Sequence, residues 1–114
     1  MSAHIDSFDT ESRATDLDPE HPEPILTPWG TMALYVDGGE VLCVQAFCPH
    51  LDGPLFQGSV AGGAITCPWH LWRFDLRTGR RLGLLGIPMP GFVKRCDVST
   101  SERGTLVLHA PIAP

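Results

Sequence analysis

Short apolar, β-favouring runs alternate with turn signals along most of the chain. Residues 31–36 and 41–47 are two such runs, and the Asp37-Gly38-Gly39 segment between them is typical of a hairpin turn. Residues 41–47 are apolar at both alternating sets of positions, so the pattern does not assign one face of this strand to a core. Further strands are expected at 64–66, 72–76, 92–98 and 105–109, with turns at 62–63, 77–80 and 99–104. The pattern predicts an all-β protein whose regular structure begins near Trp29.

Residues 1–24 lack this pattern. They are polar and rich in proline toward their end, and residues 1–23 carry seven acidic side chains against a single arginine. We expect an acidic N-terminal arm that is disordered or loosely draped, for which a solvated tail without a role is the favoured interpretation. The alternative is that the arm packs along the domain or takes part in partner docking. Residues 111–114 are expected to form a short C-terminal tail.

Composition and charge narrow the classes of function. Eleven prolines and twelve glycines in 114 residues agree with one small, loop-rich β domain. Outside the arm, six acidic and seven basic residues nearly balance, so the chain has no basic surface that would indicate a nucleic-acid partner. No apolar run is long enough for a membrane segment, and the first residues do not resemble a signal peptide.

Two mixed cysteine–histidine pairs carry most of the candidate chemistry. Cys48 and His50 form the first pair, Cys67 and His70 form the second, and 16 residues separate the pairs. Two thiolates and two imidazoles can bind one tetrahedral zinc ion. They can also bind a [2Fe–2S] cluster in which two histidines replace two cysteines on one iron. Because each pair contains one ligand of each type, the spacing favours the cluster, with Cys48 and Cys67 on one iron and His50 and His70 on the other; zinc is the alternative.

The chain resembles the Rieske family over roughly residues 31–110. The resemblance is carried by both ligand pairs with their prolines, by Phe74-Asp75 and Thr78-Gly79, and by the loop Pro88-Met89-Pro90. It implies stacked antiparallel sheets in which a small cluster-binding subdomain, about residues 47–86, is inserted in a β base domain within residues 25–110. It also implies that the 86–91 loop covers the cluster. One position departs from the family pattern, because Leu71 stands where the family usually has glycine after the second histidine.

The resemblance also implies a reduction potential at the lower end of the Rieske range. The high-potential branch joins its two ligand loops by a disulfide, and the matching positions here are Gly53 and Trp69. That branch also has serine and tyrosine hydroxyls that bond to cluster sulfurs, where this chain has Trp72 and Phe74. Without those donors the reduced, more negative cluster is less stabilised. The lower range is typical of the branch that serves oxygenases.

We therefore predict a soluble, cytoplasmic electron carrier rather than an enzyme. It would take single electrons from a reductase and pass them to a terminal oxygenase, docking both partners at the cluster tip. The alternatives are an accessory subunit of another oxidoreductase, such as a nitrite reductase, and a zinc-stabilised interaction module. Cys43 and Cys96 are expected to be free, reduced thiols. His4, His21 and His109 lack the spacing of ligands and are interpreted as bystanders.

Overall fold

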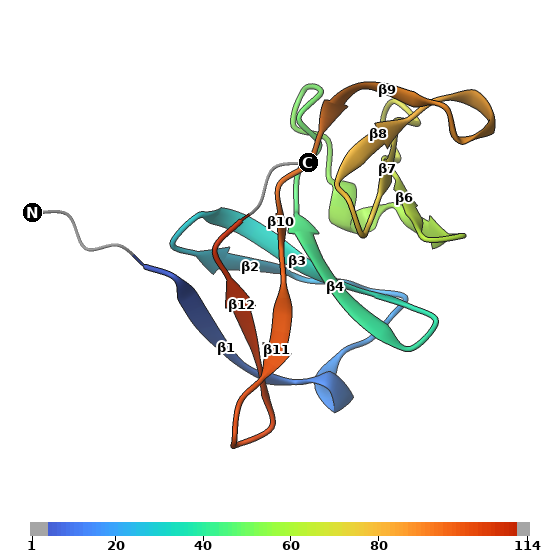
Figure 1. Ribbon diagram of the computed structural model, residues 1–114. Coiled ribbons are helices and arrows are strands. Elements are labelled where there is room, and N and C mark those ends of the chain that lie inside the picture. The colour runs from blue at the N-terminus through green and yellow to red at the C-terminus, as the bar shows by residue number, and fades with distance from the viewer. Residues whose placement is uncertain (1–4, 112–114) are drawn as a thin grey trace, which may run out of the picture.

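The computed structural model describes residues 5–111 and is built from three antiparallel sheets (Figure 1). The bounds of the strands, in sheet order, are β1 (Ser7–Arg13), β12 (Thr105–His109) and β11 (Val98–Thr100); β10 (Arg95–Cys96), β4 (Glu40–Gln45), β3 (Gly30–Asp37) and β2 (Pro24–Thr27); and β5 (Ser59–Ala61), β6 (Ala64–Thr66), β7 (Arg73–Asp75), β8 (Arg80–Leu82) and β9 (Pro88–Phe92). Short 3-10 turns lie at Ala14–Asp16, Leu55–Gln57 and Leu84–Gly86. Because β5–β9 follow β4 and precede β10, the third sheet is an insertion in the other two. The predicted all-β fold is confirmed.

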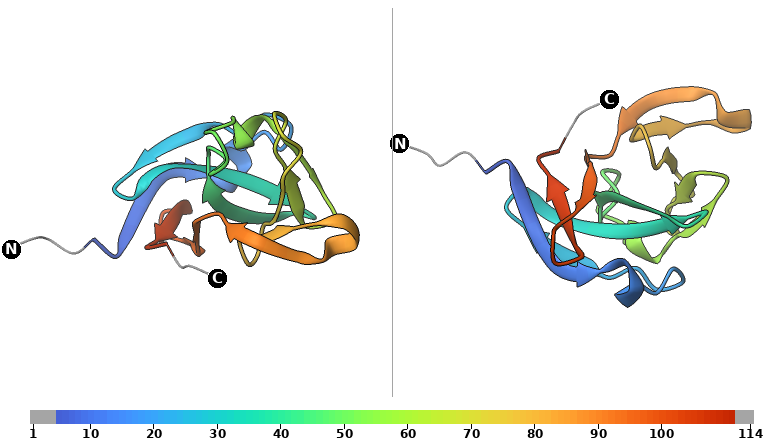
Figure 2. Two further views of the ribbon diagram at one scale, coloured as in Figure 1. Left: turned by 90° about the horizontal axis from the view of Figure 1, so that it is seen from above. Right: turned by 60° about the horizontal axis from the view of Figure 1, so that its bottom comes forward.

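The inserted sheet stands apart from the strands of the base. In two further views it remains at one end of the molecule, away from the turn between β11 and β12 (Figure 2). The chain enters the inserted sheet after β4 and returns to the base at β10. None of the helices among residues 5–111 has the length and apolar character needed to cross a membrane.

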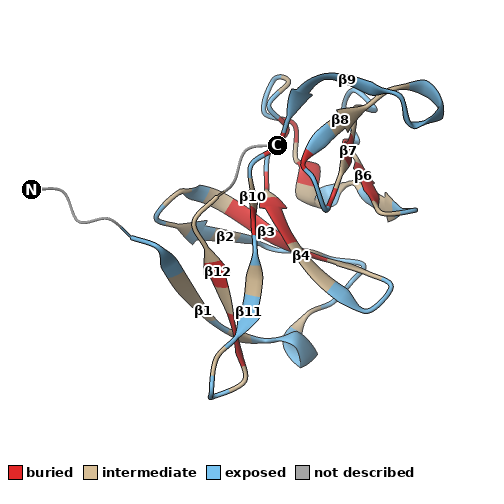
Figure 3. Cartoon of the chain, in the orientation of Figure 1, coloured by how far each residue is buried: buried red, intermediate tan, exposed pale blue. Residues whose placement is uncertain are grey.

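β3 and β4 are buried on both of their faces, which explains the unassigned pattern of residues 41–47. Successive side chains of a strand point to opposite faces. Tyr35 of β3 and Val44 of β4 belong to the larger core, beneath the inserted sheet. Leu34 and Cys43 belong to a second core that faces β12, where Leu108 is fully buried. The buried residues accordingly gather on the central strands and the inserted sheet (Figure 3).

Two glycine pairs set the register of the predicted hairpins. Gly38 and Gly39 have φ of 59° and 83°, and Gly62 and Gly63 have φ of 59° and 78°. Two successive residues with positive φ are what a tight hairpin turn requires, and glycine adopts them without a steric cost. The pairings of β3 with β4 and of β5 with β6 close on these turns. Both predicted hairpins are confirmed.

The expectation of a disordered arm was wrong for residues 7–13, which form β1. This strand pairs with β12, and the partly buried Phe8 packs against the second core. Its acidic groups are used in the fold: the Asp9 carboxylate accepts hydrogen bonds from the Thr105 hydroxyl at 3.0 Å and from Arg103 at 2.9 Å. The alternative interpretation, in which the arm packs along the domain, is therefore the correct one for this segment.

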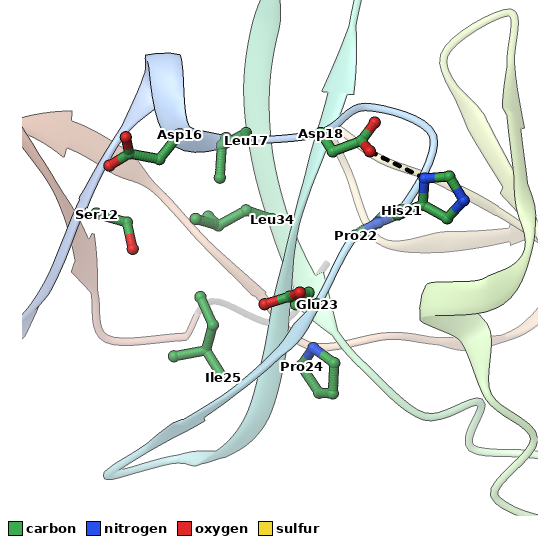
Figure 4. A pocket seen from close by; sticks show the side chains of 10 residues that line it. All are labelled: Ser12, Asp16, Leu17, Asp18, His21, Pro22, Glu23, Pro24, Ile25 and Leu34. Carbon is green, nitrogen blue, oxygen red and sulfur yellow. Dashed lines mark hydrogen bonds and ion pairs between the residues drawn. The ribbon is translucent and has the colours of Figure 1, made fainter.

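The chain between β1 and β2 also packs on the base. Together with Leu34 of β3 it lines a surface pocket, in which Leu17 and Ile25 contribute apolar side chains (Figure 4). Asp18 and His21 are joined at 2.9 Å at this pocket. His21 thus has a local partner within the segment, in agreement with its interpretation as a bystander.

Two expectations for the second half of the chain were wrong in detail. Residues 88–91, expected as part of the 86–91 loop, form the strand β9 together with Phe92, and this strand pairs with β8. The single strand expected at 92–98 is divided, because β9 ends at Phe92, β10 covers Arg95–Cys96 and β11 begins at Val98. β9 is an edge strand, and an edge strand tolerates Pro88 and Pro90 because one side of its backbone needs no ladder partner.

The new position of β1 leads to a prediction about stability. Substituting Phe8→Ala should lower the free energy of unfolding by about 1–2 kcal/mol, because part of the ring is removed from the second core. The matched control is Leu26→Ala on β2, whose side chain is 80% exposed and should change stability little. Thermal unfolding followed by circular dichroism would compare the two. Equal midpoints for both variants would show that β1 contributes nothing to the core.

Candidate metal centre

The two predicted ligand pairs lie on two loops that are closed in the same way. The first loop leaves β4, and the Cys48 N–H donates to the carbonyl of Gly53 at 2.7 Å. The second loop leaves β6, and the Cys67 N–H donates to the carbonyl of Trp72, also at 2.7 Å. In both cases the bond spans five residues, so each loop is a compact turn that starts with its cysteine.

The residue that follows each histidine has the left-handed backbone conformation. Leu51 has φ of 62° and Leu71 has φ of 59°. The sequence raised a question about the second loop, because glycine is usual at the position of Leu71. The loop keeps its turn by placing a leucine in a conformation that costs about 1–2 kcal/mol for a residue with a Cβ atom. The Leu71 side chain is 72% exposed, so little packing offsets this cost.

The sulfur atoms of both loops lie inside the larger core. Cys48 and Cys67 are both fully buried, and they share this core with Leu55 and Phe74. Burial raises the pKa of the Cys48 thiol, and its hydrogen bond with the Cys67 thiol acts in the same direction, whereas the His50 N–H and the charge of Arg81 oppose the rise. The two thiols are therefore neighbours in a dry site, where a metal ion would replace their protons.

Gly53 lets the two loops approach each other. A Cβ atom at this position would lie 3.0 Å from Cys67 Sγ and 3.3 Å from Trp69 Cβ. Gly53 and Trp69 are the positions that match the loop-joining disulfide of the high-potential Rieske branch. Here the same two positions are in close contact without a covalent link, so the loops are held together at this point by packing.

The two imidazoles form the second neighbouring pair. The ring centroids of His50 and His70 are 4.5 Å apart at an interplanar angle of 68°. His50 is half-buried, and its Nδ1 atom is buried with no hydrogen-bond partner among the described residues. His70 is exposed. A buried nitrogen without a partner is costly, and a metal ion would satisfy it.

The donors are thus arranged as two pairs of like atoms. Within residues 5–111, no three side chains of His, Cys, Asp or Glu are gathered so that they could hold a single ion together. Instead, the thiol of Cys48 is hydrogen-bonded to that of Cys67, and the imidazole of His50 contacts that of His70. A sulfur pair beside a nitrogen pair fits a binuclear centre that has two protein ligands on each metal.

Apolar side chains surround the exposed edge of this centre. Pro90 and Phe92 of β9 line a surface hollow together with Pro49, His50 and Trp72. The segment expected to cover the cluster as a loop therefore lies beside the first ligand loop as the strand β9. Large apolar residues of the ligand loops and the inserted sheet that are at least 41% exposed are Leu51, Trp69, Leu71, Leu84, Leu85, Ile87, Met89 and Phe92. Two of these exposed residues, Trp69 and Leu71, flank the polar ligand His70 in its loop, and we call the exposed apolar residues together the apolar rim.

Sequence analysis missed one set of contacts at the site. The Trp72 ring stacks on the His50 ring with centroids 4.3 Å apart and planes within 2°. The Arg81 guanidinium lies 3.3 Å from the centre of the Trp72 ring. Arg81 comes from β8, and the only signal in the sequence is its place on the second strand after the second ligand loop, which is too weak to identify it.

The remaining cysteines and histidines lie away from the two loops. Cys43 and Cys96 face each other across β4 and β10 as free, buried thiols, as expected. A hydrogen bond between them raises the pKa of Cys43 and lowers that of Cys96. His109 is bonded to the Ser99 hydroxyl at 2.7 Å. The expectation for His4 falls outside the described residues.

A comparison with known families and structures agrees with this geometry. The sequence model of the Rieske [2Fe-2S] domain matches residues 7–89. Apoptosis-inducing factor 3 of Mus musculus is 33% identical over 70 residues, which are 61% of this chain but only 12% of that protein. The chain thus matches a small part of the length of this curated relative.

Two solved structures share the whole fold. The ferredoxin of carbazole 1,9a-dioxygenase from Nocardioides aromaticivorans IC177 is 26% identical, with a TM-score of 0.74 over 95% of this chain and 100% of that one. A putative NADH-dependent nitrite reductase small subunit from Mycobacterium tuberculosis is 20% identical, with a TM-score of 0.74 over 97% of this chain and 100% of that one. At 20% identity the second likeness shows the fold alone.

The strained leucine of the second loop gives a testable prediction. Substituting Leu71→Gly should raise the midpoint of thermal unfolding by about 2–4 °C, because glycine removes the left-handed strain while losing part of that gain to its own flexibility. Leu71→Ala is the control, since alanine keeps the strain and removes only an exposed side chain. If alanine stabilises the protein as much as glycine does, the backbone of Leu71 is not the source of the strain.

Proposed function

Because the chain belongs to the Rieske [2Fe–2S] domain family, we propose that it carries single electrons from a reductase to a terminal oxygenase. A Rieske domain binds a [2Fe–2S] cluster, and the chain is an electron carrier rather than a catalytic enzyme. The observation that carries the proposal is the arrangement of the donors: two buried, free thiols that are hydrogen-bonded to each other lie beside two contacting imidazoles.

The ligands we assign are Cys48 and Cys67 on one iron and His50 and His70 on the other. Both sulfurs are fully buried, which suits the iron that stays inside the domain. The buried Nδ1 of His50 has no other partner among the described residues, so it is the atom of this ring that is available for the second iron. The cluster, when bound, accepts or releases one electron at a time.

The protein around the ligands has three tasks. The core that holds Cys48 and Cys67 excludes water from the sulfur side. The two closed loops fix the donors before any metal arrives, because their backbone bonds are made within the chain. The exposed His70 leaves one ligand accessible from outside, so it marks the shortest route for an electron to a docked partner.

We place the potential at the lower end of the Rieske range. Phe74 is fully buried in the core that contains both cysteines, and it has no hydroxyl to donate to a sulfur. Trp72 is likewise without a hydroxyl, and its ring is occupied by stacking on His50. With fewer donors toward the sulfurs, the added negative charge of the reduced state is less stabilised.

An oxygenase is the partner we favour. The carbazole dioxygenase ferredoxin, whose fold covers 95% of this chain, supports it. The apolar rim around His70 suits a brief encounter, because small redox interfaces rely little on strong specific contacts. The nitrite reductase small subunit supports the alternative of an accessory subunit. Oxidation of the reduced protein by an oxygenase, compared with its oxidation by a nitrite reductase, would distinguish these partners.

We propose a cytoplasmic location. Cys43 and Cys96 are free although they lie opposite each other on paired strands, a placement that suits a compartment in which thiols stay reduced. Cell fractionation of the producing organism, followed by detection of the chain, would test this location.

The ligand assignment predicts which cysteines and histidines the cluster needs. His50→Ser and Cys67→Ser should abolish the bound iron and sulfide and with them the visible absorption. Cys43→Ser and Cys96→Ser are the controls, because these thiols are buried in the second core and should leave the cluster in place. Iron and sulfide analysis with a visible spectrum measures both. Loss of the cluster in either control, or its retention in His50→Ser, would contradict the assignment; zinc without a visible spectrum in the unmodified protein would favour the interaction module.

The rim predicts where partners dock. Leu51→Glu or Met89→Glu should slow reduction by the cognate reductase about tenfold or more, because docking would bury a new charge, while the spectrum stays unchanged. Glu102→Gln also changes the charge by one unit, in the turn between β11 and β12 at the other end of the molecule, and should have little effect. Stopped-flow kinetics would decide: unchanged rates at the rim together with a large effect at Glu102 would place the docking surface elsewhere.

A further inference from the structure

Three groups form a single stack that ends on one of the assigned ligands. The Arg81 guanidinium carbon lies 3.3 Å from the centre of the Trp72 ring, and the other face of the stack continues to His50. The Trp72 and His50 rings are parallel within 2° at a centroid distance of 4.3 Å. The order from the inserted sheet toward the ligand is therefore a cation, an indole and an imidazole.

The surroundings hold Arg81 in this position. The edge strand β9 passes over it at Gly91, where a Cβ atom would be 3.5 Å from Arg81 Cδ and 3.8 Å from Trp72 Cζ3. The Nε atom of Arg81 is buried and has no hydrogen-bond partner among the described residues. A guanidinium packed on an indole face gains a cation–π interaction, which is stronger when water is excluded. The stack is thus held by packing on the side of β9, while Trp72 and His50 also line the surface hollow described above.

The charge of Arg81 is permanent and remains uncompensated nearby. Arginine stays protonated in proteins. The ion pairs that the described residues form with arginines involve Arg77, Arg95 and Arg103, and none of them involves Arg81. A half-buried positive charge therefore faces the histidine side of the centre through one aromatic ring.

We propose that Arg81, held against His50 by Trp72, is a positioning residue that raises the reduction potential of the cluster. The inference rests on the ligand assignment proposed above. In the redox step one electron passes from the reductase to the oxidised cluster, the centre becomes more negative by one charge, and no bond of the protein forms or breaks. A fixed positive charge beside the histidine ligands stabilises the more negative state. Trp72 contributes by keeping the guanidinium and the His50 ring in line.

The direct test is the potential of the holoprotein with Arg81→Gln, measured by protein-film voltammetry. Two stacked rings, Trp72 and His50, separate the Arg81 charge from the proposed cluster. At an effective dielectric constant of about 20, loss of one charge across that separation should shift the equilibrium about tenfold toward the oxidised cluster. For a one-electron couple that shift corresponds to a fall of about 59 mV. Arg81→Lys keeps the charge and should stay near the potential of the unmodified protein.

The matched control is Arg80→Gln on the same strand. Successive side chains of β8 point to opposite faces, and Arg80 is exposed, so the same loss of charge should leave the potential almost unchanged. If Arg81→Gln and Arg80→Gln shift the potential equally, or if Arg81→Lys shifts it as far as Arg81→Gln, the proposal is overturned.

Cluster assembly separates this inference from the proposed function. A cluster absent from the unmodified protein would contradict the proposed function itself, whereas a normal spectrum with an unshifted potential in Arg81→Gln would overturn only the role of Arg81. Should Arg81→Gln lose iron, Arg81→Met, which keeps much of the aliphatic stem, takes its place. If neither neutral variant binds iron although Arg81→Lys does, Arg81 serves assembly rather than the potential, and the inference fails.

Discussion

The two cysteine sulfurs of the candidate centre are also part of the hydrophobic core, and the rest of the site depends on this double role. Cys48 and Cys67 are fully buried between the inserted sheet and the central strands β3 and β4. Burial makes the free thiolate unfavourable, so the proton of Cys48 is held until a metal ion takes its place. The same packing fixes where each loop begins. Each histidine then follows within a few residues of a buried anchor, which brings His50 and His70 together at the surface without further support from the base.

Much of the fold could be predicted because its signals are local. A pair of glycines makes a tight turn regardless of what surrounds it, and both hairpins were found in this way. The segment at residues 7–13 was misjudged because its stability comes from a partner far along the chain: Asp9 is bonded to Thr105, 96 residues away. A count of acidic residues cannot reveal such a contact. β9 was misjudged for a different reason, since Pro88 and Pro90 suggest a loop unless the strand is known to lie at the edge of its sheet.

In the site, too, the features set by nearby residues could be predicted, whereas those set by contacts with distant residues could not. The two cysteine–histidine pairs were recognised by their spacing, which places one donor of each type on each loop. Spacing could not show that His50 is half-buried and His70 exposed, because the cover over His50 comes from other elements. Trp72 reaches His50 from the end of the second loop, and Arg81 of β8 packs on the Trp72 ring. The register between β7 and β8 that brings these groups together is set by the fold as a whole.

The two histidines have different surroundings, and in the proposed assignment each has a different part in electron transfer. In the proposed assignment His70 faces solvent among apolar neighbours and provides contact with a partner, while His50 lies against the Trp72 ring, on which the positively charged Arg81 packs. The missing hydroxyls and the arginine act on the potential in opposite directions. A hydroxyl bonds to a cluster sulfur directly, whereas the Arg81 charge acts through Trp72 and His50, and Coulomb energy falls with distance. In this proposal the missing donors keep the potential low, and the charge of Arg81 raises it from that level. Both groups lie apart from the docking residues, so the docking surface could change without altering the driving force for electron transfer.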